Sequence, residues 1–220
     1  MKERPVIFNG EMVRAILDGR KTQTRRIVKV QPGPSGFGLR SITESLNNRD
    51  TGKYFWSQSD ACGINRPRSK PFACPFGRVG DRLWVRETWT PESIDAEDGS
   101  YSPDYRATAN GQPLDGRWTP SIHMPRDACR ILLEVTAVRV ERLNDISQED
   151  AQAEGMELTG WVPSYSNPDN AGLDETLTPY DNFAMLWESI YGAESWRANP
   201  WVWVIEFRRV GDSAREVERG

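Results

Sequence analysis

The chain has 220 residues, of which 37% are hydrophobic and nine are tryptophan, and its formal net charge is −4. This length and composition indicate a folded protein with a proper core and exclude a disordered chain. No stretch has the apolar length of a membrane span, the first residues lack the apolar segment of a secretion signal, and three cysteines do not indicate a disulfide framework. We therefore expect a cytoplasmic protein.

The charge is unevenly spread along the chain. Residues 1–90 hold 17 Lys and Arg against 8 Asp and Glu, whereas residues 91–220 hold 11 against 24. The acidic total argues against avid, non-specific binding to duplex nucleic acid. The basic N-terminal part is compatible with a local site for a phosphate or a short nucleic-acid segment, and also with an ordinary solvated surface.

The first elements are a strand, a helix and a second strand. Pro5–Phe8 is an apolar run that predicts a strand, and Asn9 is placed to cap a helix whose apolar residues recur at helical spacing. Gly19 ends that helix. Thr22–Val30 predicts the second strand, and residues 31–79 are rich in Gly, Pro, Ser and Asn, which is typical of an insertion.

Residues Arg82–Thr90 alternate strongly and predict a strand. Glu87 shares a face with Leu83 and Val85, whereas Arg86 lies on the other face. If the apolar face is the core face, Glu87 points inward, and a buried carboxylate must be paired or must line a polar cavity. Glu87 is therefore either a ligand-orienting acid or half of a buried pair with an arginine.

Residues 91–120 form a second polar insertion, followed by the only histidine, His123. A lone histidine is usually structural, but its position near Arg126 and just ahead of a strand is compatible with a place in a ligand pocket. The strand, Arg130–Arg142, is apolar on both faces and is therefore expected at the centre of the sheet.

The last third of the chain predicts two helices and a strand. Ser147 can cap a short helix over Gln148–Glu154. Thr178 and the proline after it start an amphipathic helix that Gly192 ends. Pro200–Phe207 is the final strand. Five or six strands and three helices without regular alternation favour an α+β fold, with a small mixed barrel flanked by helices.

We expect a single domain over residues 1–211. Long insertions interrupt it near 31–79, 91–120 and 157–178, and residues 212–220 form a charged tail.

The segment Gly19–Arg26 is the most informative of the chain. It opens a run of six basic residues without an acid that extends to Thr43. Such a segment suits an anion or a polar ligand held against backbone, although, taken alone, it is better explained as a basic helix end followed by a solvated strand. Lys21 and Thr24 are three apart, so they share a site only if the chain still turns after Gly19 or bulges.

Several motifs in this order resemble the ASCH family, whose members have a PUA-like β-barrel. They are G-R-K-T-x-T-R, G-D-x-L-x-V, L-x-x-I-S and V-I-E-F. The resemblance runs in pieces from about Val6 to Phe207. The longer motifs W-V-R-E-T-W, S-I-H-M-P-R and N-P-W-V-W-V-I-E-F are similar to those of a phage- and prophage-borne branch.

The best-understood members of that family resemble small bacterial amidohydrolases that remove the acetyl group from N(4)-acetylcytidine. The resemblance implies catalytic roles for Lys21, Thr24 and Glu154. Around them, the candidates for substrate binding are Arg20, Arg25, Arg26, Glu87, His123 and Arg126. This chain is about twice as long as those amidohydrolases, and its insertions could cover the mouth of the barrel.

Amide hydrolysis by these residues is chemically coherent. Thr24 would be the nucleophile, and Lys21 the base if burial or a neighbouring cation lowers its pKa. Glu154 would protonate the leaving amine or orient a water. The expected partner is a modified nucleoside or a short single-stranded RNA. Other relatives resemble RNA-binding modules or ribonucleases, so a non-catalytic reader and a ribonuclease stay open.

No metal or cofactor is expected. Cys62 and Cys74 are separated by eleven residues, and His123 and Cys129 lie much further along, so zinc-finger spacing is absent. A zinc site assembled from these four residues is the alternative. The chain has no phosphate-binding G-x-x-x-x-G-K-[ST] loop and no dinucleotide fingerprint.

Overall fold

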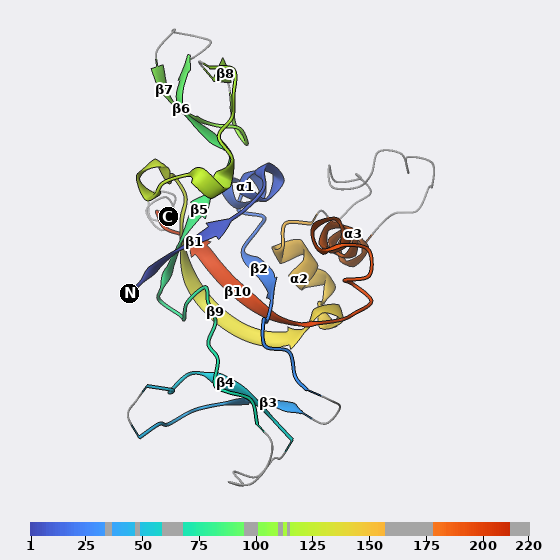
Figure 1. Ribbon diagram of the computed structural model, residues 1–220. Helices are drawn as coiled ribbons and strands as arrows, with labels where there is room; N and C mark the ends of the chain where they lie inside the picture. The colour runs from blue at the N-terminus through green and yellow to red at the C-terminus, as the bar shows by residue number, and fades with distance from the viewer. Residues whose placement is uncertain are drawn as a thin grey trace, which may run out of the picture.

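A five-stranded mixed sheet forms the centre of the protein, which we describe from a computed structural model (Figure 1). The described residues are 1–33, 37–46, 49–58, 68–94, 101–109, 112–113, 115–156 and 178–211. In spatial order the strands are β1 (Glu3–Ile7), β5 (Arg82–Arg86), β9 (Leu132–Arg142), β10 (Trp201–Arg209) and β2 (Gln23–Ile27). β1 runs parallel to β5, and the other neighbours are antiparallel. The α+β class is thereby confirmed.

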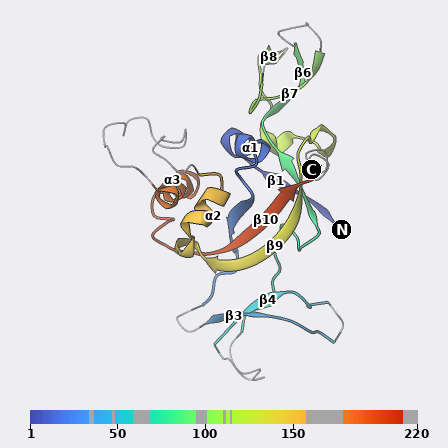
Figure 2. The ribbon, with the colours of Figure 1, turned by 180° about the vertical axis from the view of Figure 1, so that it is seen from behind.

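The sheet is curved, but its edges do not pair into a closed barrel (Figures 1 and 2). Within the described residues no ladder joins the edge strands β1 and β2. A side chain spans the gap: the Arg26 guanidinium donates a hydrogen bond to the Ile7 carbonyl at 3.2 Å. The register of β9 and β10 shifts between Glu206 and Phe207, and such bulges increase the bend of a sheet.

All three predicted helices are present, each with its predicted cap. They are α1 (Gly10–Leu17), α2 (Gln148–Ala153) and α3 (Pro179–Tyr191). Asn9, Ser147 and Thr178 each accept a hydrogen bond from an amide in the first turn of the helix that follows. Helix α2 is one residue shorter than predicted, since Glu154 is its C-cap. Each described helix falls short of the apolar length that would cross a bilayer.

The core lies between the sheet and the helices. Alternate residues of β5 and of the start of β9 and one face of α1 are fully or almost fully buried, among them Val13, Ile16, Leu83, Val85, Leu133 and Val135. Their burial in one cluster is what the period-2 and period-3.6 patterns of the sequence predict.

Two of the predicted loop insertions contain strands. The first contains β3 (Gly38–Ser41) and β4 (Tyr54–Ser57). The second contains β7 (Tyr101–Tyr105), β8 (Gln112–Pro113) and most of β6 (Trp89–Ile94). These two small sheets lie at opposite ends of the main sheet (Figures 1 and 2). The prediction of loops is therefore wrong there. Residues 157–177 and the tail 212–220 lie outside the described residues.

Aromatic side chains hold β4 against the main sheet. Trp56 packs against Trp201 with ring centroids 5.1 Å apart, and Tyr54 packs edge-on against Trp203 at 5.3 Å. Aromatic rings bury large apolar areas, so Tyr54 and Trp56 hold the paired strands β3 and β4 against the main sheet. A composition rich in turn-forming residues did not reveal this tertiary contact.

The predicted strand Arg82–Thr90 is divided in two. β5 ends at Arg86, and the chain then leaves the main sheet and pairs with β7 from Trp89 onward. The break follows from competing partners, because the Arg86 carbonyl accepts a bond from the Phe8 amide, whereas the Thr88 carbonyl accepts one from the Arg106 amide.

Asp81 fastens the first strand to the turn before β5. Its buried carboxylate accepts hydrogen bonds from the Lys2 amide at 2.8 Å, the Arg4 guanidinium at 2.9 Å and the Arg78 amide at 3.3 Å. Burial alone would raise the pKa of Asp81, but these donors outweigh it and hold the pKa below its ordinary value.

We predict that Asp81→Asn lowers the free energy of unfolding by about 1–3 kcal/mol at neutral pH, because the amide binds these donors less strongly than a carboxylate. A lowered pKa stabilises the fold fully above the unfolded value of about 3.9, and this contribution is lost as the pH falls below it. Urea unfolding at several pH values should therefore show a shallower acid loss for the variant. Equal acid slopes for the two proteins would contradict this role.

Candidate functional site

Lys21 and Glu154 form a buried ion pair at the meeting point of three elements. The Lys21 Nζ donates to Glu154 Oε2 at 2.7 Å and to the main-chain carbonyl of Glu154 at 2.9 Å. Their side chains are 0% and 3% exposed. Two residues that the family resemblance marks as catalytic, 133 positions apart in the sequence, are thus in direct contact.

Backbone contacts hold Lys21 in this position. Its amide donates to the Ala15 carbonyl at the end of α1, at 2.9 Å, and Lys21 forms an antiparallel bridge with Glu154. The next amide, of Thr22, donates to the Ala153 carbonyl at 2.8 Å. The chain between α1 and β2 is therefore pinned to the ends of two helices before the regular strand begins.

Gly155 lets the two segments approach so closely. Its φ is +98°, and a Cβ at this position would lie 3.0 Å from the Ala15 Cβ and 3.3 Å from the Lys21 Cβ. A side chain here would be strained by the backbone conformation and would press on the lysine. The glycine after Glu154 is thus part of the geometry of the ion pair.

Arg25 extends the pair into a buried charge network. Its guanidinium contacts Glu141 at 2.6 Å, Asp150 at 2.8 Å and Glu154 at 3.2 Å, and its side chain is 0% exposed. Arg139 joins the same network through Asp150 and Glu141. Arg25, which was predicted to contact a substrate, is thus enclosed by three carboxylates.

The pKa values of Lys21 and Asp150 are both lowered, but for different reasons. Burial lowers the pKa of Lys21, and the nearby Glu154 carboxylate opposes this shift without cancelling it. Burial alone would raise the pKa of Asp150, but Arg25 and Arg139 outweigh it and keep that pKa below its ordinary value. Neutral Lys21 is therefore reached more easily than a neutral surface lysine, and Asp150 stays ionised.

Thr24 is buried, but it is bonded to a different partner. Its Oγ1 accepts a hydrogen bond from the Arg26 guanidinium at 2.7 Å. In the described part of the chain no hydrogen bond joins Thr24 to Lys21 or Glu154. Lys21 and Arg26, the partner of Thr24, both lie near the ring of Phe8. The Lys21 Nζ is 5.6 Å and the Arg26 Cζ 5.4 Å from the centroid of that ring.

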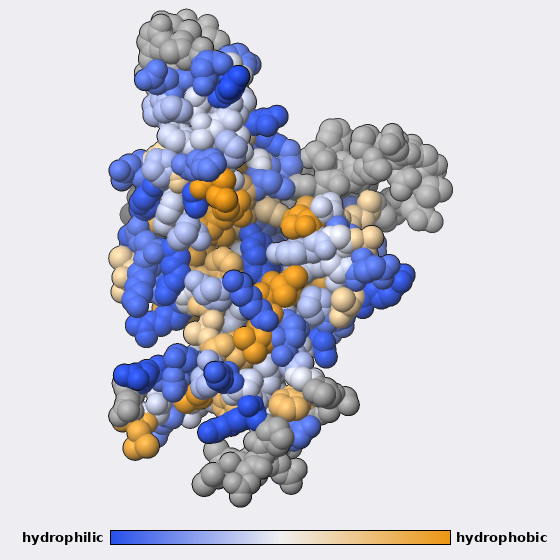
Figure 3. Space-filling view, viewed as in Figure 1, coloured by the Kyte–Doolittle hydropathy of each residue, from blue (hydrophilic) through white to orange (hydrophobic). Residues whose placement is uncertain are grey.

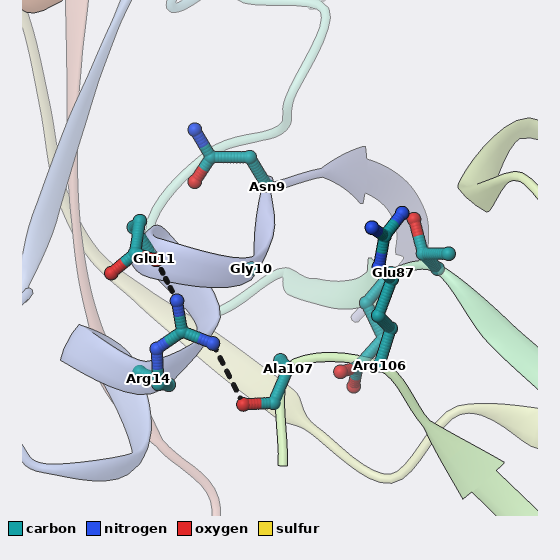
Figure 4. Close-up of a pocket in the computed structure, with 8 residues that line it drawn as sticks. Asn9, Gly10, Glu11, Arg14, Glu87, Arg106 and Ala107 are labelled. Atoms are coloured by element: carbon teal, nitrogen blue, oxygen red, sulfur yellow. Dashed lines mark hydrogen bonds and ion pairs between the residues drawn. The ribbon is translucent and has the colours of Figure 1, made fainter. Parts of the chain in front are cut away.

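Glu87 points inward, as its position in the strand predicted, and is 1% exposed. It forms a bidentate pair with Arg130, with N–O distances of 2.9 and 2.8 Å. It also lines a pocket of about 480 Å³ at the start of α1 (Figure 4). The residues that line this pocket include neither Lys21 nor Glu154, so the expected shared cavity is not observed.

The remaining predicted binding residues lie on the surface. Arg20 contacts Asp18 and the Gly155 carbonyl, so it sits beside the ion pair without touching it. His123 is exposed in a short 3₁₀ turn, and Arg126 pairs with Glu3 at 2.9 Å. Neither His123 nor Arg126 contacts the Lys21–Glu154 pair within the described residues.

The cysteines show no metal site in the described part of the chain. No three His, Cys, Asp or Glu side chains among the described residues are arranged to hold an ion. Cys62 lies outside those residues. Burial raises the pKa of the Cys74 thiol to about 11 and also raises that of Cys129, so both thiols are protonated at neutral pH.

The sequence analysis missed Phe8, Arg139, Glu141 and the charge-network role of Asp150. A signal for two of them exists: Arg139 and Glu141 are two apart in the strand expected at the centre of the sheet, so they share one face. A repeated charge on one face of a central strand predicts a buried ionic partner.

We predict that Gly155→Ala destabilises the protein by about 1–3 kcal/mol, through the strained φ and the pressure on Lys21. Gly19→Ala is the matched control, because Gly19 also has a positive φ, +76°, but no atom lies within 4 Å of its Cβ position. Thermal and urea unfolding should rank Gly155→Ala as the less stable variant. An equal loss of stability in both variants would show that the close approach of residue 155 to Ala15 and Lys21 does not contribute to the free energy of unfolding.

The chain matches no protein-family model, no curated protein and no solved structure. The likeness to the ASCH family therefore rests on the sequence motifs themselves.

Proposed function

We propose that the protein is an amidohydrolase of the ASCH type that removes an acyl group from a modified cytosine nucleoside or nucleotide. The contact between Lys21 and Glu154 carries the proposal, because it joins two residues that the family motifs mark for the same site. A buried lysine with a lowered pKa beside a carboxylate is typical of acid–base chemistry. The curved sheet, with its unpaired edges facing each other, is compatible with a PUA-like barrel.

The first step would form an acyl-enzyme. A proton passes from the Lys21 ammonium to the Glu154 carboxylate, which burial favours because two neutral groups replace two charges. The Thr24 Oγ1 then attacks the acyl carbon while the Lys21 amine takes the hydroxyl proton. Arg26 donates a hydrogen bond to this oxygen at 2.7 Å, and that bond has to break before the oxygen attacks.

The second half of the reaction would release both products. The tetrahedral carbon collapses, the C–N bond breaks, and the leaving amine takes the proton held by Glu154. A water then attacks the acyl group on Thr24 and gives a proton to the Glu154 carboxylate. The Thr24 oxygen leaves with the proton held by Lys21. The products are a carboxylic acid and the free amine, and a proton shift between Glu154 and Lys21 restores the ion pair.

Substrate access requires Arg26 to move. Lys21, Thr24 and Glu154 are between 1% and 3% exposed, and Arg26 lies over Phe8 and bonds to Thr24 and Ile7. All hydrogen bonds of the Arg26 side chain in the described structure go to neutral oxygens, so no buried ion pair has to break when it shifts. Arg26 is therefore the gate to the reacting groups.

We predict that Lys21→Ala lowers kcat for the hydrolysis of N(4)-acetylcytidine at least about a hundredfold, as expected for the loss of a general base. Lys21→Arg should not restore it, because a guanidinium stays protonated. Lys2→Ala, at an exposed lysine, is the matched control and should keep full activity. Circular dichroism checks that each variant folds. Full activity of folded Lys21→Ala would exclude this mechanism.

We also predict that kcat falls as the pH rises through the lowered pKa of Lys21, because the Lys21–Glu154 pair then loses the proton that Glu154 gives to the leaving amine. Burial places that pKa below the ordinary lysine value of about 10.4. The measurement is a pH–rate profile with and without a chelator, which should leave the rate unchanged.

A rate that disappears with the chelator would indicate a metal site instead. No turnover of any acylated cytidine, together with retained binding of single-stranded RNA, would favour a non-catalytic reader.

A further inference from the structure

A second pocket, of about 460 Å³, lies where the end of β2 meets residues 72–76 and the last residue of α3. We refer to it as the aromatic pocket. Four rings belong to its wall, from Phe72, Phe76, Tyr191 and Trp203. Phe72 packs edge-on against Trp203 with centroids 6.0 Å apart, so part of the wall is a rigid aromatic cluster. Such surfaces accept flat apolar groups.

The wall of the aromatic pocket is also basic. Arg26 and Lys29 line it, and its lining contains no acidic residue. Lys29 is exposed, and its side chain makes no ion pair with a described residue. Arg26 bonds only to neutral oxygens in the described structure. The space-filling view shows apolar and hydrophilic side chains side by side over β2 in the middle of the molecule (Figure 3).

Two other pockets formed by the described residues lack this combination. The pocket beside Glu87 has no aromatic ring in its lining and sets the carboxylates of Glu11 and Glu87 beside Arg14 and Arg106, and a third pocket contains Glu149, Asp150 and Glu206. Carboxylates repel an anionic ligand, whereas cations that form no ion pair with a described residue attract one. Of the three pockets, the aromatic pocket is the one suited to a ligand that is both flat and negatively charged.

We propose that the aromatic pocket binds a nucleotide, with the base against the rings and the phosphate held by Lys29 and Arg26. Aromatic stacking together with a nearby cation is the general physical basis of single-stranded nucleic-acid binding. This inference is separate from the hydrolysis proposed above, because Lys21, Thr24 and Glu154 are not part of the pocket lining. Arg26 connects the two places, since it belongs to the pocket and bonds to Thr24.

The first test compares ligands on the wild-type protein. The ligands are cytidine, cytidine 5′-monophosphate and labelled single-stranded RNA and DNA of about ten nucleotides, a length within the usual span of single-strand binding sites. Tryptophan fluorescence and anisotropy report binding. Cytidine 5′-monophosphate should bind at least about tenfold more tightly than cytidine, as expected for a bond to a charged group. Tight binding of the oligomers identifies a chain as the source of the nucleotide, and binding of the monophosphate alone identifies a free nucleotide.

The second test separates the phosphate from the base. Lys29→Gln should weaken binding and reduce the slope of log K against log salt by about 0.7, the value for one phosphate contact on a single strand. Phe76→Leu keeps the apolar volume but removes a ring, so it should weaken binding about tenfold and leave the slope unchanged. Lys2→Gln has the same charge change at a remote exposed lysine and should have no effect.

Three results would overturn the proposal. They are no binding of any nucleotide by the wild type, equal affinity for cytidine and its monophosphate, and equal effects of Lys29→Gln and Lys2→Gln. Unfolding midpoints close to wild type show that the variants fold. If Lys21→Ala loses hydrolysis but keeps its affinity for the nucleotide, both proposals are supported. If the wild-type protein hydrolyses its substrate but binds no nucleotide in the aromatic pocket, only the present proposal is excluded.

Discussion

The buried contact between Lys21 and Glu154 is the constraint on which the rest of the molecule depends. Two charges without solvent are tolerated only when each is fully paired, so the geometry around them has little freedom. The end of α1, the end of α2 and the start of β2 meet there, and a glycine is required at position 155 to let them meet. The same contact therefore positions three elements and defines the candidate site.

Arg25 shows how structural and chemical roles combine in one network. Its contacts with Glu141, Asp150 and Glu154 tie the sheet to α2, while its positive charge adds to the lowering of the Lys21 pKa. Removing Glu154 would leave the fully buried Lys21 without its carboxylate partner, and an unpaired buried charge is costly. Burial also lowers the pKa of Lys21, so the neutral amine that can accept a proton is more readily available.

Charge is segregated between two neighbouring places. The buried network is rich in carboxylates, whereas the aromatic pocket is lined by cations and rings without an acid. Arg26 stands between them, since it lines the pocket, lies over Phe8 and bonds to Thr24. An anionic ligand would be attracted to the pocket and repelled by the network, so the side chain that separates them decides what reaches Lys21.

Local pattern and tertiary contact contributed different parts of this protein. Strand and helix positions, the caps at Asn9, Ser147 and Thr178 and the inward direction of Glu87 followed from the sequence, because they depend on periodicity and on bonds within a few residues. The motifs also singled out Lys21 and Glu154 as partners. The strands inside the polar insertions, the open edge between β1 and β2, and the enclosure of Arg25 were decided only in the tertiary structure. They depend on contacts between segments far apart in the chain, and no local pattern encodes which distant ring or carboxylate will be within reach.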